Sequence, residues 1–168
     1  MARSRVGVVV ALAAALLGSV CVGWWVGGTV ARPTPATVIR AIDGDTVVVR
    51  TSSGRTETVR LLGIDTPETH DPRKPVQCFG PEAAAYTKRA LTGQAIRLEL
   101  DVEARDKYGR LLAYIYLGDQ RYNDRLLKLG FARLLVIPPN GSHARTMLHE
   151  EIEARAAGVG LWGACQGE

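Results

Sequence analysis

The sequence predicts one small α+β domain built around a barrel-like sheet. Short runs of alternating apolar and polar residues, separated by Gly, Ser and Pro, are typical of strands, whereas other stretches repeat apolar residues at helical spacing. With 168 residues and 46% hydrophobic content, the chain can bury one core but is short for two domains. We therefore expect a single globular domain.

An uncharged, mostly apolar run of 26 residues occupies positions 6–31, after Arg3 and Arg5. A membrane-spanning helix needs roughly 20 such residues, whereas a cleaved signal has an apolar stretch of about 7–15. The length favours a membrane anchor, but the small residues at 29–31 also fit a cleavage site, so residues 1–31 are a signal anchor or a signal peptide. Either way, the leading arginines predict an extracytoplasmic domain, membrane-anchored or secreted.

Charge alone says little about function. Without Arg3 and Arg5, the 21 basic residues fall to 19, against 17 acidic ones. This small positive excess is compatible with phosphate-bearing partners but does not require them.

The stretch RPTPAT at 32–37 predicts a linker, because Pro cannot continue a helix, and the domain then covers 38–168. Its first segments, VIRAI, TVVVR and TETVRLLGI, predict a strand followed by a hairpin that turns at Ser52-Ser53-Gly54. Simple register places Thr46 roughly opposite Leu61. The residues that flank the hairpin then emerge at the same end.

A helix is predicted next, because Gly80-Pro81-Glu82 precedes AAAYTKRAL and Gly93 follows it. The segments AIRLEL and RLLAYIYL predict a second pair of strands. Asn123 and Asp124 are expected to cap a short helix through LLKL that ends at Gly130, and ARLLVI is expected to be extended.

The last predicted helix runs from Ser142 to Gly158. It carries a stripe of apolar residues, which we expect to face the core: Ala144, Leu148, Ile152 and Ala156. The outline is thus about five strands and three helices.

Three cysteines occur. Cys21 lies within the apolar run, and we expect it to be one of the apolar residues of that run without a role of its own. Cys78 and Cys165 form a candidate disulfide, since export to an oxidising compartment favours one; free buried thiols are the alternative. Such a long closed loop stabilises by about 4.5 kcal/mol in chain-entropy terms.

Two acidic motifs flank the predicted hairpin, DGDT before it and DTPET after it. Each alone is typical of a turn or a helix cap. Together they bring Asp45 and Asp65 to one end of the hairpin, where two carboxylates repel each other unless a cation binds them. Hard divalent cations such as calcium prefer oxygen ligands.

Two arginines and a glutamate complete the candidate site. Arg60 lies on the hairpin, and Arg110 follows DKYG at the start of another strand. A guanidinium binds phosphate in a bidentate manner and suits the charge that builds on phosphorus during in-line attack. Glu68 is placed to accept a proton from an attacking water or to orient it.

Four motifs in this order, IDGDT, RLLGIDTPET, FGPEAAAYTK and DKYGRLLAYIY, resemble the staphylococcal nuclease, or thermonuclease, family over Val38 to Trp162. The resemblance implies an OB-fold, a five-stranded barrel with about three helices. It also implies a calcium-dependent endonuclease that cleaves DNA and RNA and leaves 3′-phosphate ends. Which nucleic acid is preferred stays open, and we expect a monomer without an obligate protein partner.

The resemblance also implies roles for individual residues. Asp45, Asp65 and the Thr66 carbonyl would hold calcium, while Arg60 and Arg110 bind the scissile phosphate and Glu68 acts on water. Lys107 and Tyr108 would contact a second phosphate, although Tyr108 could equally be a half-buried packing residue.

One segment departs from the family, whose archetype has two tyrosines where this chain has Leu135-Val136-Ile137-Pro138. We therefore expect weaker base stacking with the chemistry retained. Two alternative functions make different predictions for these residues. A non-catalytic OB-fold that binds nucleic acid would lack active-site residues, and a membrane-tethered scaffold leaves Arg60 and Arg110 without a role.

Overall fold

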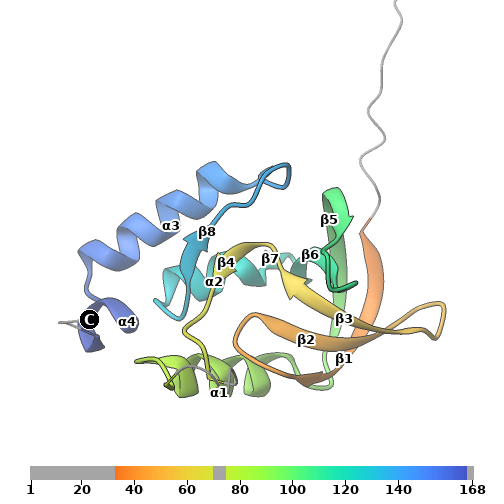
Figure 1. The fold of residues 1–168 in the computed structure, drawn as a ribbon, viewed down its shortest axis with the longest axis horizontal. Helices are drawn as coiled ribbons and strands as arrows, with labels where there is room; N and C mark the ends of the chain where they lie inside the picture. Colours follow the sequence, from red (N-terminus) through yellow and green to blue (C-terminus); the bar gives the residue numbers. More distant parts are fainter. Residues whose placement is uncertain (1–32, 70–74, 166–168) are drawn as a thin grey trace, which may run out of the picture. The chain divides into compact units, whose positions relative to one another are not determined.

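The computed structural model describes residues 33–69 and 75–165 (Figure 1). In these residues β1 pairs antiparallel with both β2 and β5, and β3 pairs in parallel with β6, which closes a barrel. A closed five-stranded barrel is the architecture of an OB-fold, so this prediction is confirmed. The barrel strands are β1 (Thr34–Ala41), β2 (Thr46–Thr51), β3 (Thr56–Leu61), β5 (Ala95–Arg105) and β6 (Leu111–Leu117).

Three short strands lie outside the barrel. β4 (Gly63–Asp65) continues from β3 and pairs with β8 (Arg133–Leu135), while β7 (Gln120–Arg121) extends β6 as a small hairpin. The β4–β8 pair carries the chain from the barrel towards the helices (Figure 1).

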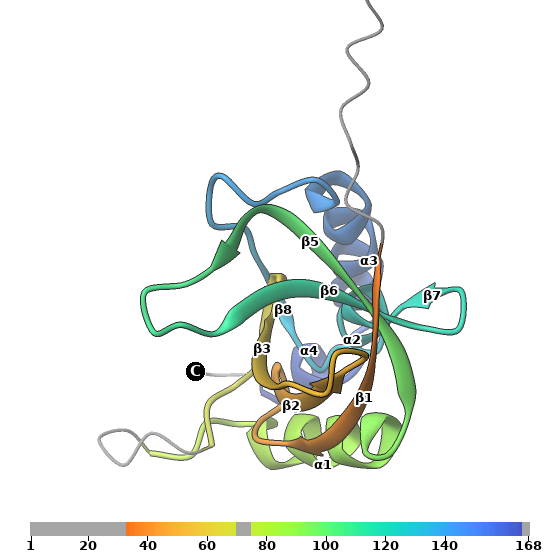
Figure 2. The ribbon, with the colours of Figure 1, turned by 90° about the vertical axis from the view of Figure 1, so that its right-hand side faces the viewer.

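The described residues form four helices, rather than about three, because the last one is a single turn near the C-terminus. α1 crosses one end of the barrel beneath β1 and β2 (Figures 1 and 2), while α2 packs against both β6 and α3. The helices are α1 (Gly80–Leu91), α2 (Tyr122–Lys128), α3 (Ala144–Ala156) and α4 (Leu161–Ala164).

The core lies inside the barrel and beneath the helices. Val47 and Val49 on β2 face Val59 and Leu61 on β3 within it, all almost fully buried. Branched side chains of this kind pack well on a pleated surface. Leu91 of α1 joins the same cluster, so burial of these apolar side chains holds α1 to the barrel end.

β1 starts at Thr34, inside the stretch expected to be a linker. Thr34 is paired with Leu98 on β5, and the carbonyl of Pro35 accepts a hydrogen bond from the Ser52 N–H. Pro35 has no N–H of its own, yet its carbonyl still takes part in this edge.

The predicted anchor or signal at 1–31 lies outside the described residues. No helix within 33–69 and 75–165 is long and apolar enough to cross a bilayer.

The hairpin turn is confirmed, with Gly54 at φ 82°, but the predicted register was one residue off. Thr46 lies opposite Arg60 instead of Leu61. The Leu61 N–H donates to the carbonyl of Asp45, just beyond the end of β2. Hence Arg60, rather than Leu61, lies beside the DGDT motif.

The predicted cap of α2 was wrong. α2 begins at Tyr122, and the Asn123 side chain is fully buried instead of capping the helix. Its Oδ1 accepts from the Ile115 N–H at 2.9 Å and its Nδ2 donates to the Leu62 carbonyl at 2.8 Å. Asn123 therefore satisfies two backbone groups between β6 and the β3–β4 connection.

The predicted apolar stripe of α3 was also wrong. Leu148 and Ile152 are 44% and 53% exposed, and the buried residues are Met147, Glu151 and Ala154. The Glu151 carboxylate accepts from the Leu134 N–H of β8. This face of α3 packs against both α2 and β8. The hydropathy of the helix residues alone does not indicate which side meets them.

Replacing Asn123 by Leu keeps the volume but leaves the Ile115 N–H and the Leu62 carbonyl buried without partners. At about 1–3 kcal/mol for each of the two groups, we expect the free energy of unfolding to fall by roughly 2–6 kcal/mol. Urea unfolding followed by circular dichroism measures this. A loss no larger than that of the exposed control Gln94→Leu would contradict the bridging role.

Candidate active site

Asp45 is the buried carboxylate of the site. Its oxygens accept hydrogen bonds from the Thr46 hydroxyl at 3.0 Å and from the Thr66 N–H at 3.1 Å. A Cβ on Gly44 would lie 2.7 Å from the Thr66 side chain, so this position requires glycine. The two acidic motifs are therefore packed directly against each other, through a contact that no larger residue permits.

Helix α1 fixes the first motif from below. The buried Thr87 hydroxyl donates to the carbonyl of Gly44 at 2.7 Å, and the Tyr122 hydroxyl in turn donates to Thr87 at 3.1 Å. Burial of its ring raises the pKa of Tyr122, so the phenol stays protonated and keeps donating. This chain of hydrogen bonds links the Asp45 loop to both α1 and α2.

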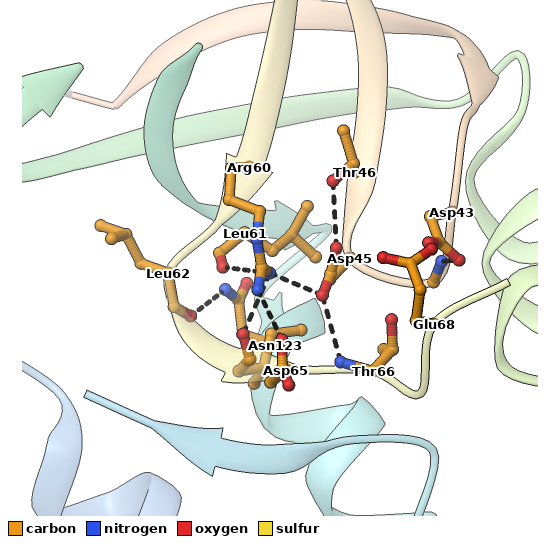
Figure 3. Close-up of polar contacts among 12 residues, drawn as sticks. Asp43, Asp45, Thr46, Arg60, Leu61, Leu62, Asp65, Thr66, Glu68 and Asn123 are labelled. Carbon is orange, nitrogen blue, oxygen red and sulfur yellow. Dashed lines mark hydrogen bonds and ion pairs between the residues drawn. The ribbon is translucent and has the colours of Figure 1, made fainter. Parts of the chain in front are cut away.

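Arg60 binds both predicted calcium ligands at once (Figure 3). Its Nη1 lies 2.7 Å from Asp45 Oδ2 and its Nη2 lies 2.9 Å from Asp65 Oδ1, while Nη1 also donates to the Ile64 carbonyl at 3.0 Å. The expectation that Asp45 and Asp65 converge is confirmed. The planar guanidinium suits such a fork between two carboxylates.

Even with Arg60 present, the cluster remains rich in negative charge. Burial raises the pKa of Asp65, and the charges of Asp45 and Glu68 add to this against the opposing effect of Arg60. Burial likewise raises the pKa of Asp43, with Asp45 and Glu68 again contributing. The four carboxylates thus lie close enough to interact electrostatically, and a bound cation would favour their ionised forms.

Glu68 lies beyond the end of β4. Figure 3 shows it with Asp43 on the side of Asp45 away from Arg60. One of its carboxylate oxygens accepts from the Thr69 N–H at 2.9 Å. The predicted base is thus brought to the carboxylate cluster by the same segment that carries Asp65.

The donor atoms present suit a hard cation. In the ranges 33–69 and 75–165, no three Asp, Glu, His or Cys side chains come together as ligands. The buried hydroxyl of Thr66, next to the predicted carbonyl ligand, makes no hydrogen bond within these residues. Two carboxylates beside an unsatisfied threonine oxygen form an all-oxygen set, which fits calcium and not a thiolate- or imidazole-binding metal.

Arg110 shares a cavity of about 490 Å³ with Arg60. Because β3 and β6 are parallel and Arg60 lies opposite Leu112, Arg110 is two residues from that position and on the same face. Its Nε donates to Asp106 Oδ2 at 2.7 Å. Burial acts to raise the pKa of Asp106, but hydrogen bonds from Arg110 outweigh burial and hold that pKa below its ordinary value.

The same cavity is lined by Lys107 and Tyr108, the predicted contacts to a second phosphate. Tyr108 is 72% exposed, so the alternative of a half-buried packing residue was wrong. The Lys107 ammonium lies 5.0 Å from the Tyr108 ring centroid. Leu135 and Ile137, from the segment where the aromatic pair was expected to be missing, belong to the apolar part of the lining.

The comparison with known proteins agrees with this geometry. The profile described as staphylococcal nuclease homologue matches residues 58–164, more than half of the chain. The chain belongs to the staphylococcal nuclease family. The matched span contains Arg60, Asp65, Glu68 and Arg110.

Relatives in this family cover most of the chain. The thermonuclease of Staphylococcus intermedius is 46% identical over 125 residues, which cover 74% of each chain. The thermonuclease of Staphylococcus hyicus is 42% identical over 125 residues, 74% of this chain and 73% of that one. Endonuclease YncB of Bacillus subtilis is 41% identical over 128 residues, 75% of this chain and 60% of its own length. Membership of the staphylococcal nuclease family makes the chain a nuclease.

Sequence reasoning about this family member missed several residues near the site. Asp43 was visible in the DGDT motif but was not assigned, although its carboxylate contacts Thr69. Arg133 lies opposite Asp65 in the β4–β8 pair, a neighbour that no local pattern indicates. Gln77 lies with Asp65 and Arg133 around a smaller cavity of about 280 Å³.

The predicted disulfide is present, since Cys78 and Cys165 are bonded with their Cα atoms 5.9 Å apart. The alternative of two free thiols does not hold.

The raised pKa of Asp65 predicts the pH dependence of stability. A carboxyl group whose folded pKa lies above its unfolded value stabilises the protein at low pH, and this contribution is lost as pH rises through the folded pKa. Asp65→Asn mimics the protonated form. In chelator, we therefore expect its stability relative to wild type to increase between about pH 4 and 7.5, by on the order of 1 kcal/mol or less because Asp65 is half exposed.

Asp106→Asn is the matched control, because the lowered pKa of Asp106 predicts the opposite sign. Its stability relative to wild type should fall as pH rises from about 2.5 to 5 and stay level above that, as seen in thermal unfolding. Parallel pH profiles for both variants would show that the charges around Asp65 do not act as described.

Proposed function

We propose that this nuclease is calcium-dependent and hydrolyses phosphodiester bonds of DNA and RNA, leaving 3′-phosphate ends. One observation carries the proposal: Arg60 contacts both Asp45 and Asp65 while it lines the same cavity as Arg110. A carboxylate cluster and two guanidinium groups thus flank one space. The thermonucleases and endonuclease that resemble the chain support a nucleic-acid substrate.

Calcium would be held by the carboxylates of Asp45 and Asp65 with the carbonyl of Thr66. When bound, it would supply positive charge that polarises the scissile phosphate and offsets repulsion in the carboxylate cluster. The oxygen-only donor set and the raised pKa of Asp65 both support a cation of this kind.

The protein's own groups then divide the reaction. Glu68 accepts a proton from the water that attacks phosphorus, opposite the leaving 5′ oxygen. Arg60 and Arg110 donate hydrogen bonds to the phosphate oxygens, whose negative charge grows as the new bond forms. Breaking the bond to the 5′ oxygen leaves the phosphate on the 3′ side and a 5′ hydroxyl.

The exposed Lys107 and Tyr108 are suited to hold a neighbouring phosphate of the strand. An ammonium group binds phosphate as a compact charge, and the phenol adds a hydrogen bond. Their place on the cavity that Arg60 and Arg110 also line supports this role.

We further propose that the domain acts on the extracytoplasmic side, either anchored through residues 6–31 or secreted. The Cys78–Cys165 disulfide supports this, because such bonds persist in oxidising compartments. The apolar run after two arginines supports export.

The test is cleavage of single-stranded and duplex DNA by the purified full-length chain, with calcium or with chelator. Glu68→Gln should lower kcat roughly 100- to 10,000-fold, and Arg110→Ala should lower it about 100-fold or more. The exposed control variants Glu82→Gln and Arg50→Ala should cut at the wild-type rate.

End-group analysis of the products should show 3′-phosphates. Binding that resists chelator and is never followed by cutting would instead indicate a nucleic-acid-binding module. Equal cutting with calcium and with chelator would exclude the metal dependence.

The apolar segment beside the cavity predicts weak base stacking. Placing an aromatic ring there with Ile137→Tyr, at an exposed position that lines the cavity, should tighten binding of a short oligonucleotide about tenfold, since one stacked base contributes about 1–3 kcal/mol. Fluorescence anisotropy in a Glu68→Gln background measures affinity without cleavage. Val159→Tyr, outside the cavity, is the control, and equal affinities for the two tyrosine variants would refute the stacking argument.

A further inference from the structure

Gln77 is hydrogen-bonded to the backbone of Glu68 in both directions. Its side-chain Oε1 accepts from the Glu68 N–H at 2.8 Å, and its own N–H donates to the Glu68 carbonyl at 3.0 Å. Pro67, the preceding residue, has no N–H with which to anchor this segment. Gln77 therefore satisfies both backbone polar groups of the residue proposed to be the base.

The start of α1 is in close contact with the same segment. The Gly80 N–H donates to the Gln77 carbonyl at 3.1 Å. A Cβ on Gly80 would lie 3.0 Å from the carbonyl oxygen of Pro67 and 3.2 Å from that of Glu68. The absence of a side chain at this position lets the helix start approach the Glu68 backbone.

A covalent bond lies next to this contact. Cys78 directly follows Gln77 and is bonded to Cys165, 87 residues away. Cys165 follows α4, and the first residue of that helix, Leu161, donates its N–H to the Gly130 carbonyl at 2.9 Å. Gln77 is thus tied to the C-terminal part of the fold.

Hydrogen bonds alone would hold Gln77 only weakly. Its side chain is exposed to solvent, so water competes for the same groups. The adjacent disulfide restricts how far the backbone at Gln77 can move and so keeps its amide within reach of Glu68.

We propose that Gln77 is a positioning residue for Glu68, and that the Cys78–Cys165 disulfide holds Gln77 in the place from which it acts. The inference rests on the proposed role of Glu68 as the base. Proton transfer from water requires the acceptor at hydrogen-bond distance, and a displacement of about 1 Å can cost roughly 100-fold in rate. A disulfide that served stability alone would have no effect on the rate of the folded enzyme.

The first experiment replaces Gln77 by Met in the full-length chain, which removes the acceptor at similar volume. Amide hydrogen exchange at Glu68, followed by NMR, should be at least about tenfold faster than in wild type. In the calcium-dependent cleavage assay, kcat should fall roughly 10- to 100-fold, while KM and the calcium concentration at half-maximal rate stay unchanged. The exposed Gln94→Met variant should match wild type in both measurements.

The second experiment removes the disulfide in a Cys78→Ser, Cys165→Ser double variant, assayed well below its own unfolding temperature. Faster exchange at Glu68 with lower kcat, in protein whose circular dichroism is unchanged, is the expected result. A lower Tm with wild-type exchange at Glu68 and wild-type kcat would reduce the disulfide to a stabilising bond and overturn its part in the proposal.

The exchange measurement needs no catalysis, so the inference and the proposed function fail separately. Unchanged exchange at Glu68 in Gln77→Met overturns the positioning role, however active the enzyme is. Faster exchange with kcat unchanged overturns it too. A wild-type chain that does not cut nucleic acid with calcium refutes the proposed function, and the inferred catalytic role of Gln77 falls with it even where exchange shows the contact.

Discussion

The active site depends on the pairing of one guanidinium with two carboxylates. Asp45 and Asp65 flank the hairpin in sequence and meet at its open end, where Arg60 binds both of them. Burial raises the pKa of Asp65, and the charges of Asp45 and Glu68 add to this although Arg60 opposes it. Arg60 therefore offsets part of the repulsion between carboxylates that lie this close together.

Closure of the barrel places Arg60 near a second arginine. The parallel contact of β3 with β6 places Arg60 and Arg110 on one face, although 50 positions separate them in the chain. Asp106 then orients Arg110, accepting from both its backbone N–H and its Nε. One strand pairing therefore brings two fixed positive charges to a single cavity, the arrangement on which the proposed stabilisation of charge at phosphorus rests.

The surrounding elements also hold the acidic segments in place through contacts with their backbone. Thr87 of α1 holds the carbonyl of Gly44, and the start of α1 holds the backbone of Glu68 through Gln77. These contacts restrain the chain that carries the carboxylates. Pre-organisation of this kind lowers the cost of bringing catalytic groups together in the transition state.

Residue order by itself determined the barrel strands, the hairpin turn and the motifs that carry Asp45, Arg60, Asp65, Glu68 and Arg110, because strand periodicity, turn glycines and paired acidic motifs are local signals. Burial of Asn123, the inward face of α3 at Met147 and Glu151, and the one-residue shift of the hairpin register were decided only by packing between distant elements. The contacts of Arg133 opposite Asp65 and of Gln77 with Glu68 were likewise beyond the sequence. Such contacts depend on which surfaces the folded chain brings together. The hydrophobic pattern and residue spacing of one helix or strand do not show which distant segment will pack against it.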